Sequence, residues 1–306
     1  MLAIVAPGQG SQKPGMLTSW LELDGVTEAA TAMSDRAHLD LIRLGTTAGA
    51  DEIKDTAVTQ PLVVAAALLA AGRLRIPAGA VIAGHSVGEL AAASIAGVLP
   101  VLDAVDLAAV RGTAMSAACA LTPTGMSALM GGQTDDVLGA LQELDLVGAN
   151  VNGGGQIVAA GPLPALEQLA ANPPNGARVI ALPVAGAFHT SFMASAETTL
   201  EAHLAGITAA DPVHPLLTNS DGSVIASGRG YLKLLVAQVT RPVRWDACMR
   251  TLGVLGVTGV LELPPAGTLV GLVKRDLKGV ATMALKSPAD LDNAAAFAAD
   301  HAGMRL

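Results

Sequence analysis

The sequence predicts an α/β protein whose larger part is a mostly parallel sheet covered by helices on both faces. Short apolar runs such as residues 2–6, 80–83 and 260–263 alternate with longer segments of helical composition, the rhythm of a parallel sheet. Residues 126–185 instead follow the order strand, helix, strand, strand, helix, strand, which predicts a ferredoxin-like unit inserted into the chain. Of the 306 residues, 51% are apolar and only 2% aromatic, so the core must be aliphatic.

The pattern assigns each element of the larger part in turn. The first strand, residues 2–6, enters a loop rich in glycine and side-chain amides, and the next strand is expected just before residue 84. Pro61 is expected in the first turn of a helix over residues 62–75, because proline is tolerated there. The remaining strands are expected at 215–219, 260–263 and 280–285, and the remaining helices within 15–38 and at 90–96, 103–118, 231–239, 245–255, 268–274 and 289–300.

The inserted unit has its own set of elements. Strands are expected at 126–130, 146–152, 156–160 and 178–184, and helices at 134–144 and 162–170. We therefore predict a large domain made of residues 1–122 and 188–306, interrupted by a small subdomain at 123–187.

Composition and charge exclude several classes of protein. The net charge of −8 argues against a nucleic-acid binder. The apolar run at residues 62–72 is too short to span a bilayer, and the first residues lack the basic start of a signal peptide. Cys119 and Cys248 have neither CxxC nor metal-ligand spacing, so we expect two free thiols, no metal and a cytoplasmic location.

The strongest local motif is Gly84-His85-Ser86-Val87-Gly88-Glu89, which lies between an apolar run and an alanine-rich helical segment. A Gly-x-Ser-x-Gly at such a junction is typical of a nucleophile elbow, in which a strained turn presents the serine hydroxyl above the sheet. The helix that follows aims its unpaired N–H groups at the same point. The alternative is a glycine-rich turn whose serine only caps the helix.

Three further positions are candidates for a site. Gln9 lies in the loop after the first strand, which lacks the lysine of a phosphate-binding loop but can present a bare backbone N–H. Arg111 stands alone in a helix of Ala, Leu and Val, where an arginine usually extends to solvent. His189 lies where a strand ends and a helix begins, a position that is more often structural unless a nucleophile needs a base.

Five short motifs occur along the chain: residues 7–12, 84–89, Arg111-Gly112, Ala187-Phe188-His189 and Pro242-Val243-Arg244-Trp245. In this order and at roughly this spacing, they together resemble the malonyl-CoA:acyl-carrier-protein transacylase family. The likeness extends from residue 2 to about residue 290. It implies an α/β-hydrolase-like large domain with a ferredoxin-like insert. The phenylalanine before His189 is similar to the malonyl-selecting version of the motif.

The resemblance also implies roles for single residues. Ser86 is the expected nucleophile, His189 the acid and base, and the backbone N–H groups of Gln9 and Val87 the oxyanion hole. Arg111 is expected to hold the malonyl carboxylate. The backbone carbonyl of Gln238 is expected to accept the His189 Nδ1–H, since no acidic residue near the histidine is an obvious third member.

The expected reaction is transfer of malonyl from malonyl-CoA to the phosphopantetheine thiol of acyl carrier protein, through a seryl acyl-enzyme and for fatty-acid synthesis. It needs no cofactor, nucleic acid or membrane. A serine esterase or thioesterase, an acyltransferase serving a polyketide synthase and a non-catalytic docking subunit are the alternatives. Because carrier protein is acidic in general, a basic patch is expected beside the cleft, and the candidates are Lys274, Arg275, Lys278, Arg241 and Arg244.

Overall fold

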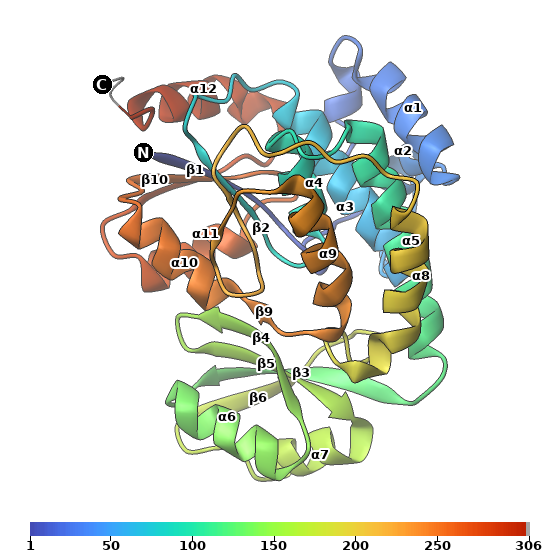
Figure 1. Cartoon of the computed structure of the whole chain (residues 1–306), viewed down its shortest axis with the longest axis vertical. Helices are drawn as coiled ribbons and strands as arrows, with labels where there is room; N and C mark the ends of the chain where they lie inside the picture. The colour runs from blue at the N-terminus through green and yellow to red at the C-terminus, as the bar shows by residue number, and fades with distance from the viewer. Residues whose placement is uncertain (304–306) are drawn as a thin grey trace.

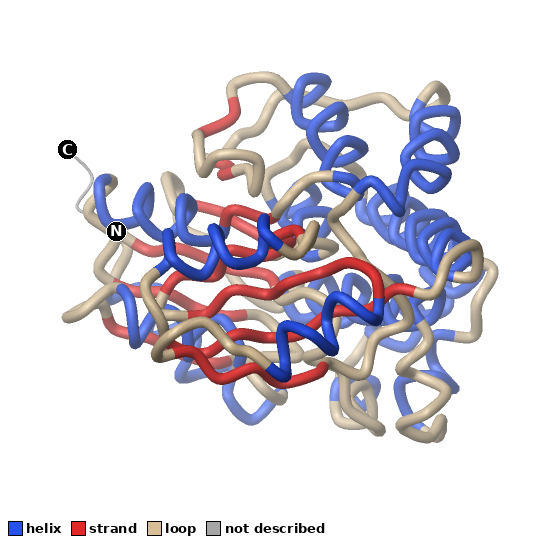
Figure 2. The backbone as a smooth tube through the Cα atoms, turned by 90° about the horizontal axis from the view of Figure 1, so that it is seen from below, coloured by secondary structure: helices blue, strands red, loops and turns tan. Residues whose placement is uncertain are grey.

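The computed structural model describes residues 1–303, which form two sheets and the helices around them (Figures 1 and 2). The larger, upper part in Figure 1 contains both described termini, and the smaller, lower part is built from the middle of the chain. The α/β class, the mostly parallel large sheet and the ferredoxin-like small unit are confirmed. Within residues 1–303, none of the helices has both the length and the apolar character needed to cross a membrane.

The large sheet has the strand order β11-β10-β1-β2-β7-β8. All neighbours pair in parallel except β8, which runs antiparallel to β7 at one edge. The parallel arrangement brings the carboxyl ends of β1, β2 and β7 to the same edge of the sheet. The strands are β1 (Leu2–Ala6), β2 (Val81–Gly84), β7 (Leu216–Leu217), β8 (Val224–Ile225), β10 (Gly259–Glu262) and β11 (Ala281–Ala284).

Helices cover both faces of this sheet, so its central strands are buried throughout. In β1, Leu2 and Ile4 join the core cluster that includes α3, α4 and α5, whereas Ala3 and Val5 face α10 and α11. The helices of the larger part are α1 (Val26–Ala37), α2 (Leu41–Thr46), α3 (Thr56–Ala71), α4 (Gly88–Ile95), α5 (Val101–Cys119), α8 (Ala194–Leu204), α9 (Gly228–Ala237), α10 (Trp245–Val254), α11 (Thr268–Asp276) and α12 (Leu291–Asp300).

The small sheet has the order β6-β3-β5-β4-β9. Its first four strands are antiparallel and, with two helices, give the predicted ferredoxin-like order. Leu129, Ile157 and Leu169 contribute to a separate apolar core. The elements are β3 (Thr124–Gly131), α6 (Thr134–Glu143), β4 (Val147–Gly153), β5 (Gln156–Pro162), α7 (Leu163–Ala171) and β6 (Ala177–Ala181).

The fifth strand of the small sheet comes from the larger part of the chain. β9 (Val243–Arg244) pairs in parallel with β4, with Asn150 opposite Val243. The sequence pattern does not predict this strand, because two residues carry no periodicity to detect. The boundaries at residues 123 and 187 stay a prediction, but the small sheet itself extends beyond them.

The prediction that Pro61 lies in the first turn of its helix is wrong. Helix α3 begins at Thr56, where the Asp55 carboxylate accepts the backbone N–H of Ala57 at 2.8 Å and caps the helix. Pro61 therefore lies inside the helix, which nearly complete burial stabilises despite the missing N–H. The earlier start also places Gln60 on the helix rather than in a loop.

Two glycines allow the elbow to pack against the first strand. A Cβ on Gly84 would overlap the backbone of Gly88, and a Cβ on Gly88 would overlap the carbonyl oxygen of Ala6. In both cases backbone blocks the space, so no side chain can move aside. The Gly-x-Ser-x-Gly spacing is thus a packing requirement as well as a conformational one.

We predict that Gly84→Ala lowers the free energy of unfolding by more than about 2 kcal/mol, since overpacking at a rigid site costs of that order. Urea unfolding followed by circular dichroism measures it. Gly271→Ala is the matched control: it lies in α11 with open space around the new Cβ, and it should stabilise by about 0.5–1 kcal/mol. Equal effects of the two substitutions would contradict the packing argument.

Candidate active site

The elbow presents Ser86 above the carboxyl end of β2. Ser86 has φ 53°, in the left-handed region, and the next residues turn directly into α4. A non-glycine residue there is strained and persists only where the surroundings hold it. Asn219 is one of those surroundings, since its Oδ1 accepts the Ser86 N–H at 2.8 Å. The capping alternative fails, because no side-chain cap of α4 is formed. The role of Ser86 as a nucleophile stays a prediction.

Ser86 and His189 lie within hydrogen-bond distance of each other. The distance between Ser86 Oγ and His189 Nε2 is 2.7 Å, and His189 Nδ1 lies 2.8 Å from the backbone oxygen of Gln238. A carbonyl can only accept, so Nδ1 carries the proton and Nε2 is free to accept the serine proton. His189, with φ 61°, is also left-handed, and only 3% of its surface is exposed.

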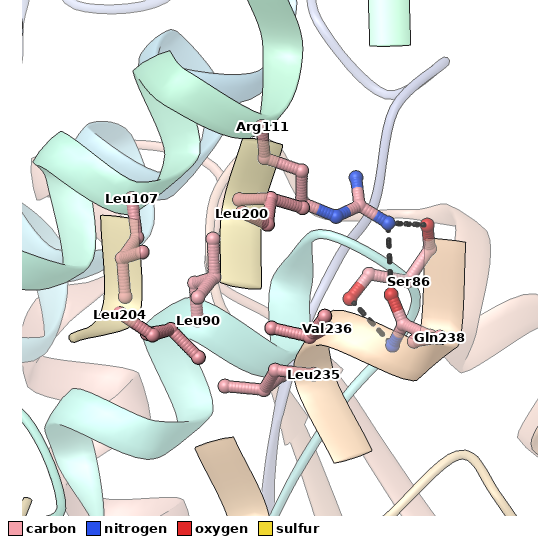
Figure 3. Close-up of a pocket in the computed structure, with 9 residues that line it drawn as sticks. All are labelled: Ser86, Leu90, Leu107, Arg111, Leu200, Leu204, Leu235, Val236 and Gln238. Carbon is pink, nitrogen blue, oxygen red and sulfur yellow. Dashed lines mark hydrogen bonds between the residues drawn. The ribbon is translucent and has the colours of Figure 1, made fainter. Parts of the chain in front are cut away.

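Arg111 is buried beside the serine instead of extending to solvent, with 3% of its surface exposed. Figure 3 shows its guanidinium pointing from α5 toward Ser86, whose Oγ lies 3.4 Å from Nη2. Two amide oxygens hold it: Gln60 Oε1 at 2.7 Å from Nη1 and Gln238 Oε1 at 2.8 Å from Nη2. Neutral acceptors orient the cation without neutralising it, so its charge is available to an anionic ligand.

A cavity of about 520 Å³ leads to these residues. One wall is the loop Gly8–Gln12, and the opposite wall consists of small-sheet strands that contribute the amides of Asn150, Asn152 and Gln156. His85 joins the two parts, since its Nε2 lies 2.8 Å from Asn152 Oδ1 and its ring packs edge-on against Trp245. The space suits an extended chain that carries its own amide groups.

A second, much smaller cavity of about 10 Å³ lies behind Ser86 and Arg111 (Figure 3). Its walls are almost entirely apolar: Leu90, Leu107, Leu200, Leu204, Leu235 and Val236. A dry wall of this kind excludes water from the far side of the guanidinium and strengthens its electrostatic interactions.

The two backbone N–H groups proposed for an oxyanion hole are available. Within residues 1–303, those of Gln9 and Val87 donate to no acceptor. Gln9 lines the large cavity, and its side chain donates to Thr56 at 3.2 Å, which anchors the loop. Val87 directly follows the serine at the N-terminus of α4. Their roles as oxyanion donors stay a prediction.

Burial shapes the charges of the site. Burial, together with the nearby positive charge of Arg111, lowers the pKa of His189 to about 3, so the ring is neutral at pH 7. Burial also lowers the pKa of Arg111 to about 10, which leaves the guanidinium charged. A neutral base and a fixed cation therefore flank the serine hydroxyl.

The structure thus brings Ser86, His189, Arg111 and the Gln238 carbonyl together. Gln60 and the side chain of Gln238 were missed. Gln60 lies just before the predicted helix over residues 62–75, although an amide beside an apolar helical run could have indicated a buried partner. For Gln238, only the carbonyl was considered. Among the described residues, no cluster of three His, Cys, Asp or Glu side chains is arranged to hold a metal ion.

The predicted basic patch is only partly available. Lys274, Arg275 and Lys278 are exposed near the end of α11, whose first half lines the cavity. Arg244 differs, because its guanidinium forms two hydrogen bonds of 2.9 Å with the Asp246 carboxylate. That ion pair satisfies Arg244 within the chain, so we remove it from the candidates for carrier docking.

The fold and the serine–histidine–arginine geometry define an acyltransferase of the serine type. The profile of the acyl transferase domain matches residues 4–289. The malonyl CoA-acyl carrier protein transacylase of Mycobacterium tuberculosis H37Rv is 56% identical over 300 residues, covering 96% of this chain and 99% of the relative. The chain belongs to the malonyl CoA-acyl carrier protein transacylase family.

Solved structures agree with this assignment. The crystal structure of MCAT from Mycobacterium tuberculosis superposes with a TM-score of 0.93 at 55% identity, covering 96% of this chain and 99% of that one. A malonyl-transacylase in complex with a type II polyketide-synthase acyl-carrier protein superposes with a TM-score of 0.89 at 29% identity, covering 96% and 99%.

We predict that kcat/KM for malonyl-CoA does not begin to fall until the pH is well below 6. The free-enzyme base must be unprotonated to accept the serine proton, and a pKa near 3 keeps it so. The pH profile of kcat/KM measures this. Acetyl-CoA, which lacks the free carboxylate, should show the same acid limb. An acid limb centred near pH 6.5 would contradict the depressed pKa.

Proposed function

We propose that this protein transfers the malonyl group from malonyl-CoA to the phosphopantetheine thiol of acyl carrier protein and so supplies malonyl units for fatty-acid synthesis. The observation that carries the proposal is the buried Arg111 guanidinium, only 3.4 Å from the hydroxyl of Ser86. A cation fixed at that distance from a nucleophile suits an acyl group with a second, free carboxylate.

In the first half-reaction Ser86 Oγ attacks the thioester carbonyl of malonyl-CoA. His189 Nε2 accepts the hydroxyl proton as the carbon–oxygen bond forms. The backbone N–H groups of Gln9 and Val87 stabilise the oxyanion, each donor contributing roughly 3 kcal/mol. When the carbon–sulfur bond breaks, His189 returns the proton to the departing coenzyme A thiolate, and a malonyl ester of Ser86 remains.

In the second half-reaction the thiol of the carrier's phosphopantetheine arm replaces coenzyme A. The 520 Å³ cavity accommodates the arm, and the amides of Asn150, Asn152 and Gln156 face the amide groups along it. His189 removes the thiol proton, the thiolate attacks the ester, and the same proton returns to Ser86 Oγ. Both halves therefore use one base and one oxyanion hole, as a ping-pong mechanism requires.

A serine esterase or thioesterase on the same elbow is the competing enzyme class. Arg111 argues against it, because a buried cation held by Gln60 and Gln238 has no use in a site that binds neutral acyl groups. A non-catalytic docking subunit would not need the 2.7 Å contact between Ser86 and His189. Service to a polyketide carrier uses the same chemistry, as the structure of the carrier-bound relative illustrates.

We also propose a cytoplasmic location. Cys119 and Cys248 are both free thiols, and Cys248 is buried, which is typical of a chain that folds in a reducing compartment.

Arg111→Ala should lower kcat/KM for malonyl-CoA by roughly 30-fold or more, because losing one partner of a buried charge pair costs about 2–5 kcal/mol. Transfer from acetyl-CoA should be unchanged or faster, since no carboxylate is involved. Mass spectrometry of Ser86 after brief exposure to each acyl-CoA gives both rates.

Two controls accompany this measurement. Ser86→Ala should abolish labelling by every acyl-CoA, and wild-type protein with malonyl-CoA should load carrier protein faster than it releases free malonate. If Arg111→Ala loses malonyl transfer and acetyl transfer equally, Arg111 does not bind the malonyl carboxylate. Fast malonate release without loaded carrier would favour the hydrolase.

Reversing the charges of Lys274 and Arg275 together should raise KM for carrier protein and leave KM for malonyl-CoA nearly unchanged. Rim charges mainly affect encounter with an oppositely charged partner, so the effect should shrink at high salt. The control is Arg73→Glu with Arg75→Glu, an equal charge change at two exposed residues between α3 and the amino end of β2. Equal effects of the two pairs would refute a local docking patch.

A further inference from the structure

One side chain holds both sides of the strained elbow. Asn219 Oδ1 accepts the Ser86 N–H at 2.8 Å, and Asn219 Nδ2 donates to the backbone oxygen of Gly84 at 2.8 Å. These two backbone groups flank the turn in which Ser86 has φ 53°. A carboxamide has one acceptor and one donor end, so it can satisfy both groups at once. Asn219 itself is fully buried, with 0% of its surface exposed.

Asn219 reaches the elbow because of the sheet order. It follows β7, which neighbours β2 in parallel with Leu216 opposite Ile82, so both strands end at the same edge. Its own backbone is tied on both sides: its oxygen accepts the Arg244 N–H at 2.8 Å, and its N–H donates to Glu89 Oε1 at 2.7 Å.

Glu89 connects Asn219 to the rest of the site. It lies in the first turn of α4, with 1% of its surface exposed. Its second oxygen accepts the side-chain N–H of Gln238, whose own oxygen accepts from Arg111 Nη2 at 2.8 Å. Gln238 Nε2 also lies 3.2 Å from the backbone oxygen of Ser86. The backbone N–H and C=O of the nucleophile are thus both held by this network.

Glu89 must be an acceptor at both oxygens. One oxygen faces the Asn219 N–H and the other faces the Gln238 amide, both of which are donors. Gln238 cannot reverse its amide, because its NH₂ would then face the guanidinium of Arg111, which only donates. Burial raises the pKa of Glu89, whereas the hydrogen bonds from Asn219 and Gln238 and the charge of Arg111 lower it. Because a donor faces each oxygen, the carboxylate form is the one that fits the site.

We propose that Asn219 and Glu89 are positioning residues for acyl transfer. Asn219 holds the Ser86 elbow in its attacking conformation, and Glu89 fixes the Gln238 amide that orients Arg111. The role of Glu89 rests on the proposed function, because it concerns selection of the malonyl group. The role of Asn219 does not, because it concerns the reactivity of Ser86 toward any acylating or sulfonylating reagent.

The Asn219 half is tested by the rate at which Ser86 is labelled, by malonyl-CoA and by a small sulfonyl fluoride that needs no arginine. Asn219→Ala should lower both labelling rates by about 100-fold, the scale of a 1 Å misplacement of a reacting group. The affinity for malonyl-CoA should change little. Thr218→Ala is the matched control: the residue is adjacent and equally buried, but its hydroxyl only accepts the Ser220 N–H.

Thr218→Ala should label at a rate near that of the wild type even where its melting temperature falls. If folded Asn219→Ala is labelled by the sulfonyl fluoride at the wild-type rate, Asn219 does not position Ser86. Wild-type protein that reacts with the sulfonyl fluoride but not with malonyl-CoA would refute the proposed function and leave this half standing.

Glu89→Gln preserves shape and tests the second half, including the case in which Asn219→Ala does not fold. The new NH₂ group of residue 89 faces the NH₂ group of Gln238, and two donors repel each other. The Gln238 amide must therefore turn or move away, and Arg111 loses the oxygen that accepts from it. The Asn219 N–H keeps its acceptor, the remaining oxygen of residue 89. The ratio of malonyl to acetyl transfer should fall at least roughly tenfold, with labelling by sulfonyl fluoride retained.

Glu262→Gln is the control for the second half. Glu262 is another fully buried carboxylate, but its oxygens accept backbone N–H groups of α11, including Leu269 and Val270 at 2.9 Å. It should lose stability without changing the malonyl-to-acetyl ratio. An unchanged ratio in Glu89→Gln would overturn the Glu89 half.

Discussion

The polar groups around the elbow are arranged about the 2.7 Å contact between Ser86 Oγ and His189 Nε2. The two residues are 103 positions apart, and both adopt left-handed backbone conformations that ordinary side chains avoid. Neither conformation stabilises itself. The glycines at 84 and 88, the carbonyl of Gln238 and the amide of Asn219 hold the two residues in place, so much of the surrounding polar network serves this one distance.

In the proposed function, the charge of Arg111 couples selection of the acyl group to the strength of the base. In the free site the cation contributes to the low pKa of His189, second only to burial. A carboxylate that pairs with Arg111 offsets that positive charge and therefore raises the basicity of the ring. The acyl group that the arginine recognises is thus also the one that improves the base, which connects binding of the remote carboxylate to the reacting centre.

The arrangement of strands and helices could be predicted from the sequence, because periodic apolar residues mark the elements and glycine or proline residues mark their ends. The Gly-x-Ser-x-Gly turn, the strand–helix alternation and the six elements of the insert all have patterns that local sequence displays. The start of α3 was misplaced because Pro61 is a stronger signal than the Asp55 cap. The side chains of Gln60, Glu89 and Asn219 could not be assigned. Their partners Arg111, the Asn219 N–H and the Ser86 N–H lie 51, 130 and 133 positions away, respectively, across the fold. Only the three-dimensional arrangement brings those partners within hydrogen-bond distance.

The short strand β9 ties the two sheets together in a way that bears on how such enzymes can be recombined. It pairs with β4 of the small sheet, yet it follows Gln238 by only a few residues and precedes Trp245, which packs in the core of the large part. The small sheet is thus not formed by the inserted segment alone, because one of its strands comes from outside that segment. A chimaera that exchanged residues 123–187 with those of a relative would leave the foreign β4 beside the native edge strand, and a mismatch there would act on the same segment that orients the histidine.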